Sequence, residues 1–190
     1  LRATIESGGE NLLKGLSNLL DDLERGKGKL QIKMTDLDAF KIGENVATTE
    51  GSVIGRTPLM ELLQYKPATD KVAKRPLMIV PPWINKYYIL DLRPENSFIK
   101  WAVDQGHTVF VLSWVNPDSK LAEESFEDYG RDGVLAALDM IEKATGEKEV
   151  NAIGYCLGGT LLSAMLAYMA KVGDERIKSA TFFTTLTDFE

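Results

Sequence analysis

Residues 149–160 (EVNAIGYCLGGT) constrain the fold of this chain more than any other stretch. They begin with an apolar, partly β-branched run, which is typical of a strand buried on both faces of a parallel sheet. We expect Gly154 to end this strand and residues 161–170 to form a helix. Between them, residues 154–158 (GYCLG) have the G-x-S-x-G spacing with cysteine in the serine position. This spacing predicts a sharp strand-to-helix turn with Cys156 at its tip, the context of a nucleophile elbow.

The spacing of this motif has a steric reason. A side chain at the tip of such a turn has strained backbone angles and projects into a cleft, and larger residues two positions away would collide, so Gly154 and Gly158 must be small. The N–H of Leu157 would lie at a helix N-terminus, where it can stabilise an oxyanion. An isolated cysteine in an apolar stretch is more often a small buried hydrophobic residue. Because strand, glycines and helix agree here, we interpret Cys156 as a catalytic nucleophile.

Composition excludes several classes of protein. The chain has 190 residues, 44% of them hydrophobic, which is enough for one sizeable core and short for two full domains. A formal net charge of −6 without any Lys/Arg run argues against a nucleic-acid-binding surface. No apolar run approaches the roughly 18 to 20 residues of a membrane span, and the first residues lack a signal-peptide profile. A single cysteine excludes an internal disulfide, as expected in a reducing cytoplasm.

The N-terminal residues predict an amphipathic helix. Ser7 and Glu10 have the capping-box spacing, and leucines recur at helical intervals over residues 12–23. We therefore predict a helix over residues 10–25, ended by Gly26-Lys27-Gly28. Its leucine face either packs against the rest of the protein or docks on a partner protein, a second subunit or a hydrophobic particle.

The helix and an irregular linker make up a first segment, residues 1–43, and residues 44–190 are expected to form one domain. Predicted strands cover 77–80, 108–114, 150–153 and 179–186, preceded by a hairpin of 45–49 with 52–55. Predicted helices cover 94–105, 126–145 and the elbow helix to about residue 172. Strands that alternate with helices favour right-handed βαβ units and a mostly parallel sheet. The order of elements predicts an α/β fold, specifically the first half of an α/β-hydrolase core.

The loop after the strand 77–80 is expected to supply a second backbone donor to the oxyanion. This loop begins with residues 81–84 (PPWI), and the prolines carry no N–H. The donor is therefore expected at Trp83 or Ile84, and we favour Ile84. Alternatively, the prolines only stiffen a loop that lines the core. The next polar residues, Asn85 and Lys86, either fix this loop or approach a phosphorylated substrate.

The predicted nucleophile has no evident base within the chain. The only histidine, His107, stands at the start of the strand 108–114, whereas an elbow and its partners lie at carboxyl ends of strands. Seven residues at ~3.3 Å each place it roughly 20 Å from the predicted site, so we interpret it as structural and hydrogen-bonded. Asp188 follows the last predicted strand, but the order nucleophile, acid, histidine needs a histidine after Cys156. We therefore expect the chain to be part of a longer polypeptide and to be inactive alone.

Four motifs are linked along the chain: GYCLGGT at 154–160, PPWINKYYILD at 81–91, QGHTVF at 105–110 and SWVNP at 113–117. Together they resemble polyhydroxyalkanoate synthases of the class that uses short-chain substrates. The segments 20–26 and 35–40 also resemble the N-terminal region of that family, so the resemblance covers nearly the whole chain. The chain departs from the family pattern in its length, because family members carry a cap insertion, an aspartate and a histidine that this chain does not reach.

The resemblance implies an acyltransferase that polymerises (R)-3-hydroxyacyl-CoA into polyester with release of coenzyme A, without a further cofactor or metal. It implies that Cys156 carries the acyl chain as a thioester and that Leu157 and Ile84 stabilise the oxyanion. The missing histidine would deprotonate Cys156, and the missing aspartate would help to activate the next 3-hydroxyl. The resemblance further implies a cytoplasmic homodimer at the surface of a growing polyester granule, with residues 10–25 as a contact for partner or granule-associated proteins.

Two other classes stay open at this point. A cysteine hydrolase of the dienelactone-hydrolase kind also carries cysteine on the elbow, and it would release free hydroxy acid in place of polymer. In a third interpretation, this half-domain is a binding or assembly module without catalysis.

Overall fold

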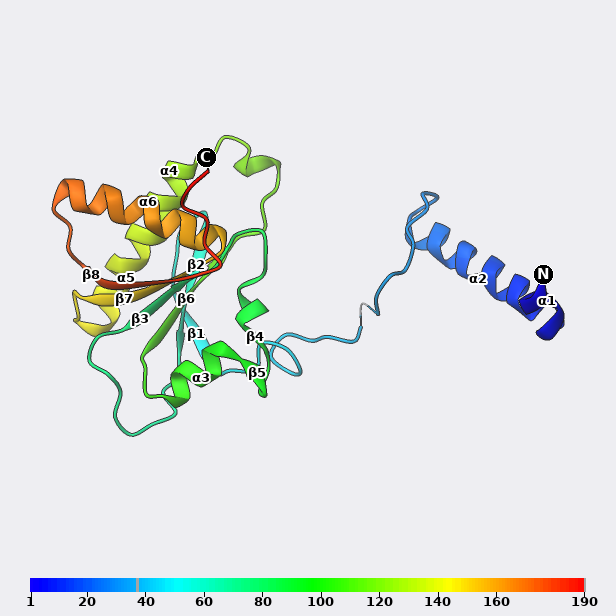
Figure 1. Ribbon diagram of the computed structural model, residues 1–190, viewed down its shortest axis with the longest axis horizontal. Coiled ribbons are helices and arrows are strands. Elements are labelled where there is room, and N and C mark those ends of the chain that lie inside the picture. Colours follow the sequence, from blue (N-terminus) through cyan, green and yellow to red (C-terminus); the bar gives the residue numbers. More distant parts are fainter. Residues whose placement is uncertain (37, 190) are drawn as a thin grey trace. The chain divides into compact units, whose positions relative to one another are not determined.

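A computed structural model describes residues 1–36 and 38–189 of the chain (Figure 1). The contacts within the chain divide it into two units, Leu1–Phe40 and Lys41–Glu190. None of the described helices is both long and apolar enough to cross a membrane.

The first unit contains two helices, α1 (Arg2–Glu6) and α2 (Glu10–Arg25). The bounds of α2 confirm the predicted helix, and Gly26 ends it. The predicted capping box is wrong, because the short helix α1 makes Ser7 a C-terminal cap. The N-cap of α2 is Gly9, which has a φ of 91° and offers no side chain. This backbone conformation favours glycine over every other residue.

The leucine face of α2 is exposed. No residue of the helix is buried, and its leucines are at least two-fifths accessible at five positions: Leu12, Leu13, Leu16, Leu19 and Leu20. An amphipathic helix with this pattern presents a continuous apolar stripe, which water solvates poorly.

The second unit is built on a six-stranded sheet with the order β1-β2-β6-β3-β7-β8. The strands are β1 (Gly51–Arg56), β2 (Met60–Tyr65), β3 (Leu77–Val80), β6 (Val109–Trp114), β7 (Val150–Tyr155) and β8 (Ile177–Phe183). Strands β6, β3, β7 and β8 are parallel, and β1 and β2 continue the sheet in antiparallel fashion. The carboxyl ends of the four parallel strands therefore share one edge. Strands β4 (Asp91–Arg93) and β5 (Asn96–Ser97) form a separate small sheet.

Helices cover both faces of the six-stranded sheet (Figure 1). They are α3 (Phe98–Asp104), α4 (Phe126–Asp128), the π-helical turn η3 (Tyr129–Leu135), α5 (Ala136–Thr145) and α6 (Leu157–Val172), with short 3-10 turns η1 (Tyr87–Leu90) and η2 (Ser119–Leu121). Alternate residues of β3 point to opposite faces. Leu77 and Ile79 belong to the core that includes α3, whereas Met78 and Val80 belong to the core that includes η3, α5 and α6. Burial on both faces explains the uninterrupted apolar sequence of β3.

The strands predicted at 77–80, 108–114 and 52–55 are confirmed, the last as part of β1, but the hairpin partner predicted for 52–55 is wrong. Residues 45–49 form no strand, and β1 pairs with β2. The turn between them is held by Thr57, whose hydroxyl accepts the N–H groups of Leu59 and Met60 at 3.2 Å each. The polar groups of Thr49 are used elsewhere, because its N–H and hydroxyl both donate to the buried carboxylate of Asp91.

Two predicted helices differ in detail from the structure. The helix predicted at 94–105 begins only at Phe98, because β4 and β5 use the preceding residues and the hydroxyl of Ser97 caps α3 by accepting the N–H of Lys100 at 2.8 Å. The helix predicted at 126–145 is continuous, but its middle part, η3, is π-helical. Wide turns of this kind are rare in proteins, and many of those that are found lie at functional sites.

Candidate active site

Cys156 lies at a tight bend between β7 and α6. Its φ of 54° and ψ of −124° are strained for a residue with a side chain, as the nucleophile motif predicted. The backbone on both sides is fixed, because the N–H of Cys156 donates to the carbonyl of Phe183 at 3.0 Å and its carbonyl accepts the N–H of Gly159 at 2.9 Å. The residue as a whole is half-buried and not part of the fully buried core.

The glycines of the motif stand where no side chain fits. A Cβ on Gly154 would lie 2.4 Å from the Cα of Gly159, and a Cβ on Gly158 would lie 2.1 Å from the carbonyl oxygen of Val80. The prediction that both must be small is confirmed. The structural reason is packing of the strand against the helix and of the helix against the loop after β3. Gly159 was not singled out from the sequence, yet a Cβ there would lie 1.9 Å from the hydroxyl of Thr185.

Leu157 is the first residue of α6. The first N–H groups of a helix have no acceptor within it, and the N–H of Leu157 donates to no other group among residues 1–36 and 38–189. This N–H is adjacent to Cys156 in the chain and carries the positive end of the helix dipole. It is therefore available to a negatively charged oxygen beside the thiol.

The loop after β3 packs directly on the first turn of α6. The close approach is set by Gly158, because a Cβ there would also lie 2.6 Å from the carbonyl oxygen of Pro81. That carbonyl accepts a buried hydrogen bond of 2.7 Å from the indole Nε1 of Trp114. Within the described part of the chain, neither the N–H of Trp83 nor that of Ile84 has an acceptor, so both are available as donors.

The same loop is fixed further along by two polar contacts. The ammonium of Lys86 donates to the side-chain oxygen of Asn116, which lies in the loop after β6. Asp91, which follows η1, is 1% exposed and accepts two hydrogen bonds from Thr49, at 2.8 Å from the hydroxyl and 3.2 Å from the N–H. Of the two roles open to Lys86 from the sequence, this contact supports fixing of the loop.

Two phenols lie near the Asp91 carboxylate. Burial raises the pKa of Tyr65 above its ordinary value, and Tyr87 and Asp91 raise it further. The pKa of Tyr87 is also raised, first by burial and then by Asp91. Both phenols therefore stay neutral at physiological pH. Sequence reasoning missed this cluster, because Tyr65 and Asp91 are far apart in the chain and no local pattern links them.

His107 lies at the opposite edge of the sheet from Cys156. It precedes β6, whereas Cys156 follows the carboxyl end of the parallel strand β7. The location expected from the sequence is thus confirmed. The expected hydrogen bond of its ring is not found among the described residues, where only the backbone N–H of His107 donates, to Ala102 at 3.2 Å.

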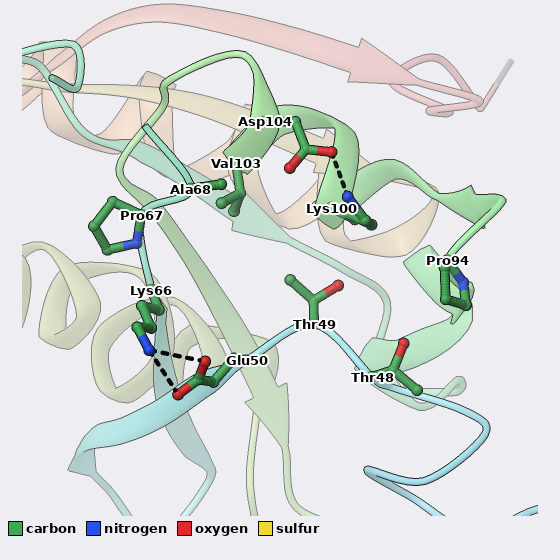
Figure 2. Close-up of a pocket in the computed structure, with 10 residues that line it drawn as sticks. All are labelled: Thr48, Thr49, Glu50, Lys66, Pro67, Ala68, Pro94, Lys100, Val103 and Asp104. Atoms are coloured by element: carbon green, nitrogen blue, oxygen red, sulfur yellow. Dashed lines mark hydrogen bonds and ion pairs between the residues drawn. The ribbon is translucent and has the colours of Figure 1, made fainter. Parts of the chain in front are cut away.

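A cavity of about 470 Å³ also lies at this opposite edge, where β2 ends beside the start of β6 (Figure 2). Its cations are already neutralised, because Lys66 pairs with Glu50 at 3.1 Å and Lys100 pairs with Asp104 at 2.5 Å. The cavity therefore presents no free charge to a ligand, and it is remote from the thiol. Among the described residues, no cluster of three or more His, Cys, Asp and Glu residues is placed to hold a metal ion.

Matches to two known families together cover the whole chain. Residues 1–102 match the family described as "Poly-beta-hydroxybutyrate polymerase (PhaC) N-terminus", and residues 76–190 match the α/β-hydrolase fold. A fungal esterase structure from Rhizomucor miehei aligns with a TM-score of 0.53 at 17% identity, over 83% of this chain and 50% of that chain. Together with the sheet order, these matches confirm the predicted α/β-hydrolase fold.

Three curated proteins show the similarity in sequence. The chain is 58% identical over 188 residues to the poly(3-hydroxyalkanoate) polymerase subunit PhaC of Rhizobium meliloti, with 99% of this chain and 31% of that protein covered. It is 59% identical over 189 residues to the poly(3-hydroxyalkanoate) polymerase of Methylorubrum extorquens, covering 100% and 31%. It is 48% identical over 188 residues to the corresponding subunit of Cupriavidus necator, covering 99% and 31%. The chain thus spans about a third of the length of these relatives.

Proposed function

The chain belongs to the poly-beta-hydroxybutyrate polymerase (PhaC) family, and from this membership we propose that it supplies the nucleophile of an acyltransferase that polymerises (R)-3-hydroxyacyl-CoA. The product is a polyhydroxyalkanoate, and coenzyme A is released. The observation that carries the proposal is the backbone of Cys156, with a φ of 54° and a ψ of −124° at the strand-to-helix bend. This strain is maintained by packed glycines on both sides, which is the arrangement that presents a nucleophile.

The first step is the transfer of the acyl group to Cys156. The thiolate attacks the thioester carbonyl, a carbon–sulfur bond forms, and the carbonyl electron pair moves onto oxygen. The N–H of Leu157 stabilises this oxyanion, together with a donor from the loop after β3, for which we propose Ile84. The intermediate then collapses, and coenzyme A leaves as a thiolate that takes up a proton. We place the general base outside residues 1–190, since His107 lies at the other edge of the sheet.

The second step is chain growth, and it explains why the nucleophile is sulfur. Exchange between a thiolate and a thioester is nearly isoenergetic, so the acyl group on Cys156 stays as activated as it was on coenzyme A. The 3-hydroxyl of another unit then attacks the carbonyl and gives its proton to the general base. An ester bond forms, the carbon–sulfur bond breaks and the Cys156 thiolate is regenerated. An ester on serine would be less activated toward a hydroxyl.

Mass spectrometry of the full-length protein tests this function. After incubation with (R)-3-hydroxybutyryl-CoA and rapid acid quench, we expect one acyl mass on the peptide that contains Cys156, one equivalent of early CoA release and polymer as the final product. Free hydroxy acid in place of polymer would select a cysteine hydrolase. Polymer without any adduct on Cys156 would refute the covalent intermediate.

We further propose that helix α2 is the contact for a granule surface or its associated proteins in a cytoplasmic homodimer. The proposal is supported by the exposed leucine face in the first unit. In the full-length protein, replacing Leu13, Leu16 and Leu20 by glutamine should reduce co-sedimentation with polyester granules at least several-fold. Replacing Asn11, Lys14 and Asn18 by glutamine keeps the helix and leaves the leucine face intact, so it serves as the control. Equal sedimentation, dimerisation and activity in both variants would remove this role.

A further inference from the structure

Trp114 reaches from the end of β6 to the loop that follows β3. It is the last residue of that strand and is 8% exposed. Its indole N–H donates to the carbonyl of Pro81 at 2.7 Å, and its ring meets the ring of Trp83 edge-on, with 6.1 Å between centroids. One side chain thus holds this loop through both a hydrogen bond and an aromatic contact.

The held carbonyl lies next to the candidate oxyanion donors. Pro82 has no N–H, so the first amide hydrogens after the Pro81 carbonyl belong to Trp83 and Ile84. The carbonyl itself packs against the first turn of α6, where only a glycine fits at position 158. Trp114 therefore fixes the position of the loop donors relative to the N–H of Leu157, at the helix start.

Trp114 is itself held by the π-helical turn η3. A Cβ on Gly133 would lie 2.4 Å from Cη2 of the indole, so the ring packs directly against the backbone of that turn. On the same side, the rings of Tyr129 and Trp114 are 5.3 Å apart between centroids. With β6, the turn η3 and the loop after β3 all in contact with it, the indole has little freedom to move.

We propose that Trp114 is a positioning residue for acyl transfer to Cys156. It touches no reacting atom. It holds residues 81–84 so that a backbone N–H of this loop meets the oxygen that becomes negative when the Cys156 sulfur adds to the thioester carbonyl. The bond to the coenzyme A sulfur then breaks and that sulfur leaves with a proton. This inference rests on the proposed function, because it concerns the oxyanion of that reaction.

The test compares two reactions of the same thiol in the full-length protein. Acylation by (R)-3-hydroxybutyryl-CoA passes through an oxyanion, whereas alkylation by iodoacetamide displaces iodide at a saturated carbon and forms none. For Trp114→Phe we expect single-turnover CoA release to slow by about 10- to 100-fold, since a displaced donor loses part of the stabilisation of the transition state. Alkylation should stay within about twofold of wild type, because the thiol and its bend are unchanged.

Two further variants separate the hydrogen bond from packing. Trp101→Phe makes the same chemical change on an exposed ring stacked on Phe98, and both reactions should stay at the wild-type rate. Trp114→benzothienylalanine, introduced by codon suppression, keeps the ring system and removes only the N–H donor. It should show the same selective loss of acylation. Because it keeps the packing of the indole, it tests the inference even where Trp114→Phe fails to fold.

Unchanged acylation in the benzothienylalanine variant would overturn the inference, and so would an equal loss of acylation and alkylation. A wild-type protein that alkylates but releases no CoA would instead refute the proposed function, and the inference with it. The two failures are therefore distinguishable.

Discussion

Replacing Cys156 by serine in the full-length protein is expected to slow CoA release from (R)-3-hydroxybutyryl-CoA by roughly 10³-fold or more. The hydroxyl is close to the thiol in size, so the strained bend and the glycine packing around it are kept. What is lost is the easily ionised sulfur and the activated thioester that it forms. The thermal midpoint should therefore stay within about 2 °C of wild type while turnover falls.

A matched control moves the thiol from the bend into the helix that follows it. Ser163 lies in α6, seven residues after Cys156 and away from the bend. The double variant Cys156→Ser with Ser163→Cys restores one cysteine to the chain but should restore neither CoA release nor an acyl adduct. Rates near wild type in the single variant, or an adduct on residue 163, would show that the bend is not what makes the sulfur reactive.

The second large effect is expected from Gly158→Ala, which should destabilise the full-length protein by about 3–5 kcal/mol or prevent folding. The added methyl would lie 2.1 Å from the carbonyl oxygen of Val80 and 2.6 Å from that of Pro81. Both obstacles are backbone atoms of a buried strand end and its loop, so neither can rotate away. Relief requires that α6 move off the sheet.

Gly130→Ala is the control for this prediction. It also places a methyl in a tight space, 2.3 Å from Met165, but the obstacle is the sulfur of a flexible side chain. Methionine adapts its rotamers easily, so the destabilisation should stay near or below 1 kcal/mol. The comparison uses thermal or urea unfolding of the full-length proteins. Equal stability of the two variants would contradict the close contact between α6 and the loop after β3.

The elements that could be predicted are those whose signal is local. Strand β3 is buried on both faces, so its sequence is uninterrupted apolar, and α2 has a leucine stripe bounded by glycines. Strand β2 is not among the predicted strands, because the segment is too short to classify and its strand character depends on pairing with β6, about 50 residues away. The helix α1 and the small sheet of β4 and β5 were missed as well, since each is too short for periodicity to identify.

The same distinction applies to the site. Cys156, Gly154 and Gly158 lie within five residues, and the motif predicted both the bend and the small side chains. The hydrogen bond from Trp114 to Pro81 joins residues 33 positions apart, and that from Thr49 to Asp91 joins residues 42 positions apart. Both depend on strand order and register, which one sequence does not specify. Likewise, no local pattern predicts the π-helical form of η3, whose Gly133 packs against the indole of Trp114.

The π-helical turn η3 has a consequence for how this segment tolerates changes in length. A π-helical turn holds one more residue than an α-helical turn, so removing a single residue from Tyr129–Leu135 would convert it into ordinary helix without breaking the element. Because the wide turn spreads its extra residue over nearly the same rotation, such a codon deletion would leave the faces of α4 and α5 nearly aligned, whereas deleting one residue within α5 would rotate the turns that follow by about 100°. The segment therefore tolerates the loss of one residue better than α5 does, as long as Tyr129 and Gly133, which contact the indole of Trp114, are kept.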